Sequence, residues 1–215
     1  MDKTCKISIV GFGKVECDAD LLDITLSVYR TDDKSSIAQE QVNNVINKIL
    51  NELKIIGFKG KDVITTPMGF YEDYEWEKDK KVYKGIQVSQ SVKCRIRDLV
   101  KNTKKIIKII DFVGNENEKI NFSQRFYLEN FNQSLELCRE IAYKDALTKA
   151  EHYAKLSNTT IKGVNSISEY KNIDYNDRRD YCAIGASESD DDSSTNFSIK
   201  KISTDMTLYV DFYAE

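Results

Sequence analysis

Histidine, the side chain most used for acid–base and metal-assisted chemistry, occurs once in the sequence, at His152. A multi-histidine metal site is therefore excluded, and a Ser-His-Asp or Cys-His site has no support unless another residue substitutes. His152 flanks the apolar stripe of a predicted helix, beside Glu151 and Lys155. We expect it to occupy a solvated position on that helix.

The thiols are the second group of possible nucleophiles and metal ligands. Their number is odd, they are widely separated, and no C-x-x-C pattern occurs, so neither a disulfide framework nor a zinc site is indicated. A catalytic thiolate also needs a nearby cation or helix N-terminus. We expect free, mostly buried thiols. The five cysteines are Cys5, Cys17, Cys94, Cys138 and Cys182.

Gly11-Phe12-Gly13 begins like the phosphate-binding fingerprint of dinucleotide-binding folds. Glu16 stands where the third glycine would be, and the element that follows is a predicted strand rather than a helix. Glycines permit the unusual backbone dihedrals of a turn. We therefore expect a structural turn here, and the sequence predicts no cofactor.

An acidic run at residues 188–192 contains side chains that could bind calcium. It lacks the alternating ligand spacing and the central glycine of an EF-hand loop. Charged blocks without such a pattern usually stay hydrated. We expect a mobile, solvated loop over residues 176–196, and we predict no metal site and no catalytic residue.

One group of aromatic side chains does indicate a function. Aromatic residues are enriched at protein interfaces because they bury a large area at low entropic cost. If the hairpin that carries the group projects, it is the natural surface for self-association or for a protein partner. The alternative is that these side chains pack beneath the first helix. The group consists of Phe70, Tyr71, Tyr74, Trp76 and Tyr83.

Composition limits the class of protein. The 215 residues, 40% hydrophobic and 31% charged, suffice for one large domain, and we predict a single domain over residues 1–215. The 32 basic and 35 acidic side chains nearly cancel, which argues against nucleic acid as a partner. No stretch has the ~18 apolar residues of a membrane span, and the N-terminus lacks the apolar core of a signal peptide. A cytoplasmic location is therefore expected.

The first half of the chain has the pattern of a β-α-β-β unit over about residues 21–97. Alternating apolar residues predict strands at 7–10 and 22–28, which the glycine turn would join as a hairpin. A helix is predicted from a capping box at Ser36 to Ile56, with Gly57 as its left-handed stop. Residues 63–76 and 82–97 should then pair as an antiparallel hairpin.

The second half repeats this pattern over about residues 119–213, after a bridging helix at about 98–114 that Asp98 and Gly114 would cap. A strand at 120–128 precedes a long helix that Asn130 opens. Two strands follow, at about 163–170 and 199–212. The predicted class is α+β: two β-α-β-β units forming mainly antiparallel sheet packed against three amphipathic helices.

Val10-Gly11-Phe12-Gly13-Lys14-Val15, followed by Asp20 and the strand at 24–28, resembles the opening of the SIMPL-domain family. The resemblance runs in order through nearly the whole chain. Later matches are Lys61-Asp62-Val63, Thr65 and Thr66, Tyr71 and Tyr74, Gly85, Val92 to Asp98, Ala142, Ala146, Ala150 and Ala154, Gly163-Val164 and Ile167-Ser168-Glu169.

What this resemblance implies is limited. The family is named for an animal adaptor of a pelle-like kinase. Its bacterial members include surface immunogens that can form ring-like oligomers, and many are periplasmic or envelope proteins. The family has no established catalytic residues that could be assigned to this sequence. The resemblance implies a homo-oligomer.

Two functions are compatible with these observations. The first is a non-enzymatic self-assembling or protein-interaction domain that associates through strand edges and the aromatic hairpin. The alternative is a module that binds a small molecule or stress signal in a pocket between sheet and helices.

Overall fold

The computed structural model describes residues 5–77, 80–116, 119–170 and 197–215. They form two compact units. The α3 unit contains Met1–Ala19, Tyr127–Asp180 and Lys200–Glu215, and the hairpin unit contains Asp20–Phe126 and Tyr181–Ile199.

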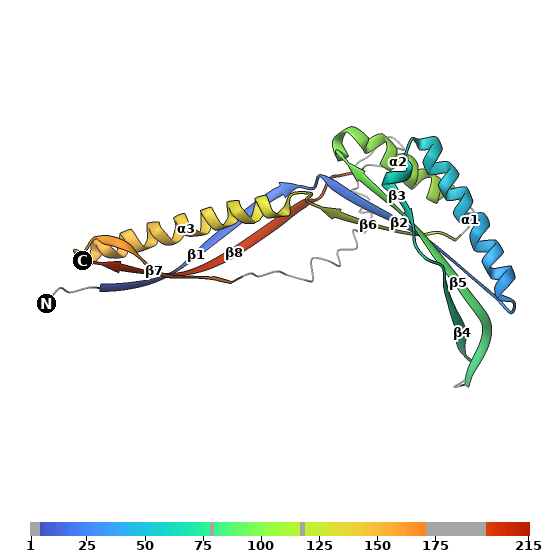
Figure 1. Cartoon of the computed structure of the whole chain (residues 1–215), viewed down its shortest axis with the longest axis horizontal. Coiled ribbons are helices and arrows are strands. Elements are labelled where there is room, and N and C mark those ends of the chain that lie inside the picture. Colours follow the sequence, from blue (N-terminus) through green and yellow to red (C-terminus); the bar gives the residue numbers. More distant parts are fainter. Residues whose placement is uncertain (1–4, 78–79, 117–118, 171–196) are drawn as a thin grey trace, which may run out of the picture. The chain divides into compact units, whose positions relative to one another are not determined.

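The α3 unit is a three-stranded antiparallel sheet with one helix. Strands β1 (Cys5–Asp18), β8 (Lys201–Ala214) and β7 (Ile161–Tyr170) lie in the order β1-β8-β7. Helix α3 (Phe131–Leu156) runs along β1 and β8, as Figure 1 shows. The helix presents a buried column of alanines to the sheet: Ala142, Ala146, Ala150 and Ala154.

Two glycines of β1 allow the helix to approach the strand closely. A Cβ at Gly11 would lie 2.1 Å from the carbonyl oxygen of Ala142, and a Cβ at Gly13 would lie 2.1 Å from that of Cys138. Both distances are far below van der Waals contact, so only glycine fits. These glycines face buried residues of β8 in register, Gly11 opposite Leu208.

The prediction of a turn at Gly11-Phe12-Gly13 is therefore wrong. Strand β1 continues through these residues as far as Asp18, and it pairs with β8 near the other end of the chain instead of with residues 22–28. The glycines are required because the helix backbone lies against them, and they form neither a turn nor a phosphate cradle.

The hairpin unit is built on a second sheet, with strand order β3-β5-β2-β6 and with β4 also paired to β5. The β2–β5, β3–β5 and β4–β5 pairs are antiparallel. Its strands are β2 (Leu21–Asp32), β3 (Val63–Thr65), β4 (Gly69–Glu77), β5 (Lys80–Arg97) and β6 (Asn121–Tyr127). Its helices are α1 (Ser35–Ile56) and α2 (Leu99–Asn115), with a 3₁₀ turn η1 at Gly60–Asp62.

The core of this unit lies between α1 and one face of β2 and β5. Alternate residues of β2 are fully buried, and their partners in register include Val92 and Cys94 of β5. The helix contributes Val42, Ile49 and Leu53, which recur with helical spacing. We call this buried side of the sheet the α1 side.

The α+β class is confirmed. The predicted order strand, helix, strand, strand is found in β6, α3, β7 and β8, whereas β2 and α1 are followed by three strands, because the predicted strand at 63–76 is divided between β3 and β4. The strands form two sheets, however, and β6 lies beside β2. Gly57 ends α1 in the left-handed conformation, as predicted. Asp98 is the N-cap residue of α2, as predicted, although its side chain makes no capping hydrogen bond. Two other predicted caps are wrong: α1 begins after Lys34 and not at Ser36, and α2 runs past Gly114. The predicted loop at 176–196 lies wholly outside the described residues.

Candidate interaction surface

The β4–β5 hairpin extends past the rest of its sheet. Pairing between β2 and β5 ends at Asp32 and Ile86, so beyond Ile86 strand β5 pairs only with β4 among the described strands. Figure 1 shows this two-stranded section. We call residues 73–77 and 80–85 the hairpin tip. Its five β4 residues span roughly 17 Å.

A bulge separates the hairpin tip from the rest of the sheet. Asp73 lies opposite Gly85 while Tyr74 lies opposite Tyr83, which leaves Lys84 without a partner in register. Gly85 has φ +122, and a Cβ there would lie 2.6 Å from the carbonyl oxygen of Asp32. Glycine is therefore needed both for the backbone conformation and for the space.

Alternation along β4 divides the predicted aromatic group between two faces. Phe70 lies opposite the buried Val88, so Phe70, and with it Tyr74 and Trp76, belongs to the α1 side of the sheet. Tyr83 joins them because it faces Tyr74 across the strands. The remaining member, Tyr71, lies on the opposite side. We call Phe70, Tyr74, Trp76 and Tyr83 the aromatic face.

All five aromatic side chains are exposed, from 39% for Tyr74 to 72% for Trp76. They therefore do not pack beneath α1, and that alternative is wrong. The aromatic face has its own order: the rings of Tyr74 and Tyr83 meet edge to face at 5.5 Å. Lys81 Nζ lies 4.0 Å from the centre of the Tyr74 ring, a cation–π contact.

The Tyr74 hydroxyl donates a hydrogen bond of 2.8 Å to the carboxylate of Glu72. That bond, with smaller contributions from partial burial and from the negative charge of Glu72, raises the pKa of Tyr74. The phenol is therefore a neutral donor at physiological pH, and Glu72 and Lys81 are charged groups beside the rings of this face.

The opposite face of the hairpin tip is charged. Lys84 forms ion pairs with Glu75 and Glu77, and its hydrogen bond to Glu77 is the main reason that the pKa of Lys84 is raised. Asp73 accepts a hydrogen bond of 2.9 Å from the Thr31 hydroxyl. The tip is therefore amphipathic, with aromatic side chains on one side and ion pairs on the other.

A polar cluster occupies the open face of the α3 unit. Asp211 of β8 accepts hydrogen bonds from Ser8 (2.7 Å) and Ser166 (2.8 Å) of the two flanking strands and pairs with Lys6 at 2.9 Å. These bonds lower the pKa of Asp211 to about 2, and the hydrogen bond from Ser8 contributes most. The cluster links all three strands of the sheet, and we assign it a structural role.

The candidate nucleophiles show no reactive arrangement in the part of the chain that the structure describes. His152 is exposed on α3, as expected. Cys94 and Cys138 are buried, and burial, with smaller contributions from Asp62 and Asp23, raises the pKa of Cys94 to about 12. Cys182 lies outside the described residues. Within residues 5–77, 80–116, 119–170 and 197–215, no three His, Cys, Asp or Glu residues are grouped as metal ligands.

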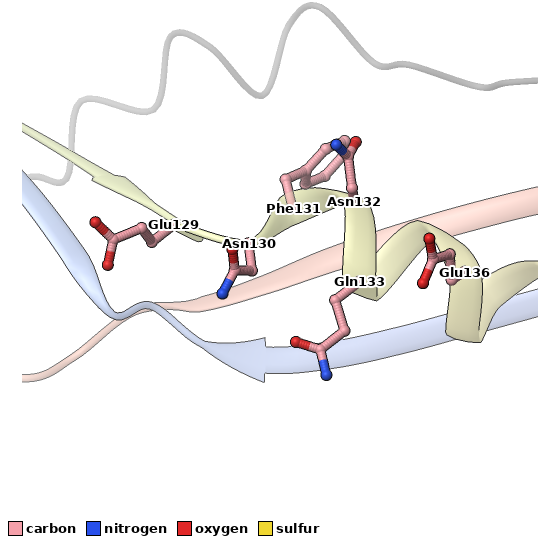
Figure 2. Close-up of a pocket in the computed structure, with 6 residues that line it drawn as sticks. All are labelled: Glu129, Asn130, Phe131, Asn132, Gln133 and Glu136. Atoms are coloured by element: carbon pink, nitrogen blue, oxygen red, sulfur yellow. The ribbon is translucent and has the colours of Figure 1, made fainter.

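A cavity of about 480 Å³ lies where α3 begins. Its lining comes from one continuous segment, drawn in Figure 2: Glu129, Asn130, Phe131, Asn132, Gln133 and Glu136. It is a surface depression at a helix start, and it is not the expected pocket between sheet and helices.

Sequence reasoning found the aromatic residues but missed the bulge and the free edge of β4. The bulge depends on Gly85, where glycine is required by the φ of +122 and by the closeness of Asp32, and neither can be read from the sequence. The signal available in the sequence was the acidic composition of β4, where Glu72, Asp73, Glu75 and Glu77 alternate with aromatic residues.

Comparison with protein-family models agrees with the resemblance noted in the sequence. The model described as "SIMPL: Protein of unknown function (DUF541)" matches residues 7–212. The chain belongs to the SIMPL family. Among the described residues of this SIMPL protein, no helix is both long and apolar enough to cross a membrane.

Two curated relatives are similar to this SIMPL protein. Both are named "26 kDa periplasmic immunogenic protein", one from Brucella melitensis biotype 1 and one from Brucella abortus strain S19. Each is 24% identical over 169 residues, which is 76% of this chain and 66% of the relative, just under two thirds of its length. Their names place these relatives in the periplasm, so the expected cytoplasmic location has no support.

Proposed function

We propose that this SIMPL protein is a non-enzymatic self-assembling domain and that the aromatic face of the β4–β5 hairpin is the surface that contacts a second copy. The observation that carries the proposal is the exposure of four large aromatic side chains on one side of a two-stranded projection. The buried and unpaired thiols and the solvated histidine support a role other than catalysis.

The size of the aromatic face supports a specific but weak contact. Its four side chains are on average about half exposed, and each offers about 200 Å², so together they expose roughly 400 Å² of surface. Exposed apolar patches of this size on soluble proteins are often functional. A stable dimer buries about 800 Å² per partner, so the polar rim of the hairpin must supply the remainder.

Packing of a second copy on the aromatic face would also stabilise the hairpin. A two-stranded hairpin is marginally stable in water without a third strand or a packed face. The Tyr74–Tyr83 contact and the Lys84 ion pairs supply part of that stability. Packing a second aromatic face on the first, related by a two-fold axis, would bury the rings of both copies and supply the rest.

Size-exclusion chromatography with light scattering at increasing protein concentration tests this proposal. We expect a monomer at low micromolar concentration and a dimer or larger species at a few hundred micromolar. Trp76→Ala should weaken association by about 2–4 kcal/mol, or about 30- to 1000-fold, as for a central aromatic hot spot.

Tyr153→Ala is the matched control, because Tyr153 is also an exposed aromatic residue but lies on α3. It should associate like the unmodified protein. A strictly monomeric protein at every concentration, or an equal effect of both substitutions, would contradict the proposal.

A further inference from the structure

Among the described strands, β4 is an edge strand along its whole length. Its nine residues pair with β5 on one side, and no described strand pairs with the other side. The backbone N–H and C=O groups on that side are positioned to hydrogen-bond with an added strand. At about 3.3 Å per residue the edge is roughly 30 Å long.

The other described sheet edges are protected. On β1, the Phe12 N–H donates to the Asp145 carboxylate at 2.9 Å, and Lys149 donates to the Val10 carbonyl at 3.1 Å. Asp145 and Lys149 are themselves joined at 2.6 Å, so side chains of α3 occupy the middle of this edge.

The remaining edges are interrupted, short or basic. Strand β7 contains two register shifts, a device that prevents further pairing. Strand β3 has only three residues, and β6 carries Arg125. In contrast, β4 contains no proline and no basic residue, and its register shift leaves the extra residue, Lys84, in β5.

The charges of β4 determine which strand can pair with it. The strand carries four acidic side chains: Glu72, Asp73, Glu75 and Glu77. Asp73, Glu75 and Glu77 share one face, so two β4 strands side by side would bring six carboxylates together on that face of the seam, against one lysine, Lys84, from each copy. Like charges opposite one another across strands are destabilising and opposite charges are stabilising. The edge therefore disfavours its own copy and favours a basic strand.

We infer that the free edge of β4 binds an extended, lysine- or arginine-rich peptide segment of a partner protein, which adds to the sheet as a further strand. Main-chain hydrogen bonds supply affinity in this mode of recognition, and alternate side chains supply specificity. Basic side chains of the peptide would pair with the carboxylates of β4, and its apolar side chains would extend the aromatic face. The inference concerns the edge and does not depend on self-association through that face.

The chain contains its own probe for the test. Trp76 is the only tryptophan, lies in β4 and is 72% exposed, so its fluorescence reports on this strand. Three nine-residue peptides should be titrated into the full-length protein: one alternating lysine and valine, one alternating glutamate and valine, and the lysine peptide with a central proline. Proline removes a backbone donor and disrupts the added strand, while the lysine charges remain.

We expect saturable binding of the lysine peptide, and at least tenfold weaker binding of both other peptides. Amide hydrogen exchange should show protection of β4 only with the first peptide. Equal binding of the proline peptide would show nonspecific charge attraction and overturn the inference. Absence of binding by all three would also overturn it.

Variants separate this inference from the proposed self-association. The Glu75→Lys/Glu77→Lys double variant, which changes two carboxylates on the charged face of the hairpin tip, should reverse the preference to the glutamate peptide, and circular dichroism verifies that it folds. Tyr83→Ala, which removes a ring of the aromatic face but lies in β5 and not on the β4 edge, should weaken self-association but still bind a fluorescently labelled lysine peptide within about threefold. If Tyr83→Ala lost both properties, or if the double variant kept its preference for the lysine peptide, the edge would not be a separate site.

Discussion

Replacing Gly13 by alanine tests the structure of the α3 unit most sharply. The added methyl carbon would lie 2.1 Å from the Cys138 carbonyl oxygen and 2.9 Å from the Ala142 nitrogen. Both neighbours are helix backbone, which cannot rotate away as a flexible side chain can. To restore even 3.0 Å, the helix must retreat from β1 by about 0.9 Å, the difference between 3.0 and 2.1 Å.

The energetic cost follows from that displacement. A gap of 0.5–1 Å removes a quarter to a half of the attraction of each atom pair, which is about 0.15 kcal/mol at contact. For on the order of 40 atom pairs between α3 and β1, the loss is about 1.5–3 kcal/mol. Measured costs of overpacked cores, typically about 1–3 kcal/mol, agree with this range.

Thermal unfolding followed by circular dichroism at 222 nm is the assay. Gly13→Ala should lower the midpoint by about 3–12 °C, given about 2–4 °C per kcal/mol for a chain of this size. Gly60→Ala is the matched control, because nothing lies within 4 Å of a Cβ there. It should stay within about 0.5 kcal/mol of the unmodified protein. A Gly13→Ala protein as stable as the control would refute the close helix–strand packing.

Four further predictions concern other parts of the chain. Gly57→Ala should lower the free energy of unfolding in urea by about 1–2 kcal/mol, because Gly57 has φ +98. Gly57→Asn should lower it less, and equal losses would contradict a left-handed cap. Because the pKa of Asp211 is lowered in the folded state, its stabilisation is complete above the unfolded pKa near 3.8 and is lost as the pH falls toward 2. Asp211→Asn should therefore have a lower melting temperature than the unmodified protein at pH 7, and this difference should vanish by pH 2; a difference that does not change with pH would speak against the cluster. Cys94 should not react with Ellman's reagent in the native protein, so Cys94→Ser should remove one reactive thiol only after denaturation. The prediction of a single domain implies one cooperative transition, with coincident changes in Trp76 fluorescence and circular dichroism, and two separate transitions would disprove it.

Elements with a strong local period were predictable from the sequence. The apolar spacing of α1, its stop at Gly57 and the antiparallel pairing of β4 with β5 all appear in the structure. Their signals lie in neighbouring residues, where helical and strand periods decide the backbone conformation.

Pairing between distant strands was not predictable in the same way. Alternation shows that β1 is a strand, but it does not show that the partner is β8, at the other end of the chain. The glycines of β1 were misinterpreted for a related reason. The sequence does not distinguish a glycine that a close helix contact requires from one that a turn requires.

The candidate surface was predictable in composition but not in geometry. The aromatic residues stand out in the sequence, yet their division between two faces depends on the register of the hairpin and on the unpaired Lys84. The free edge of β4 depends on the order of strands in the sheet, which is set by contacts far along the chain.

Amide hydrogen exchange on dilute and concentrated samples tests the proposed surface most directly, since it locates the residues that become covered on association. Residues 70–77 of β4 and the beginning of β5 should exchange more slowly in the concentrated sample, while the α3 helix is unchanged. Protection confined to the α3 unit, with the hairpin exchanging equally fast in both samples, would show that copies of this protein associate through another surface.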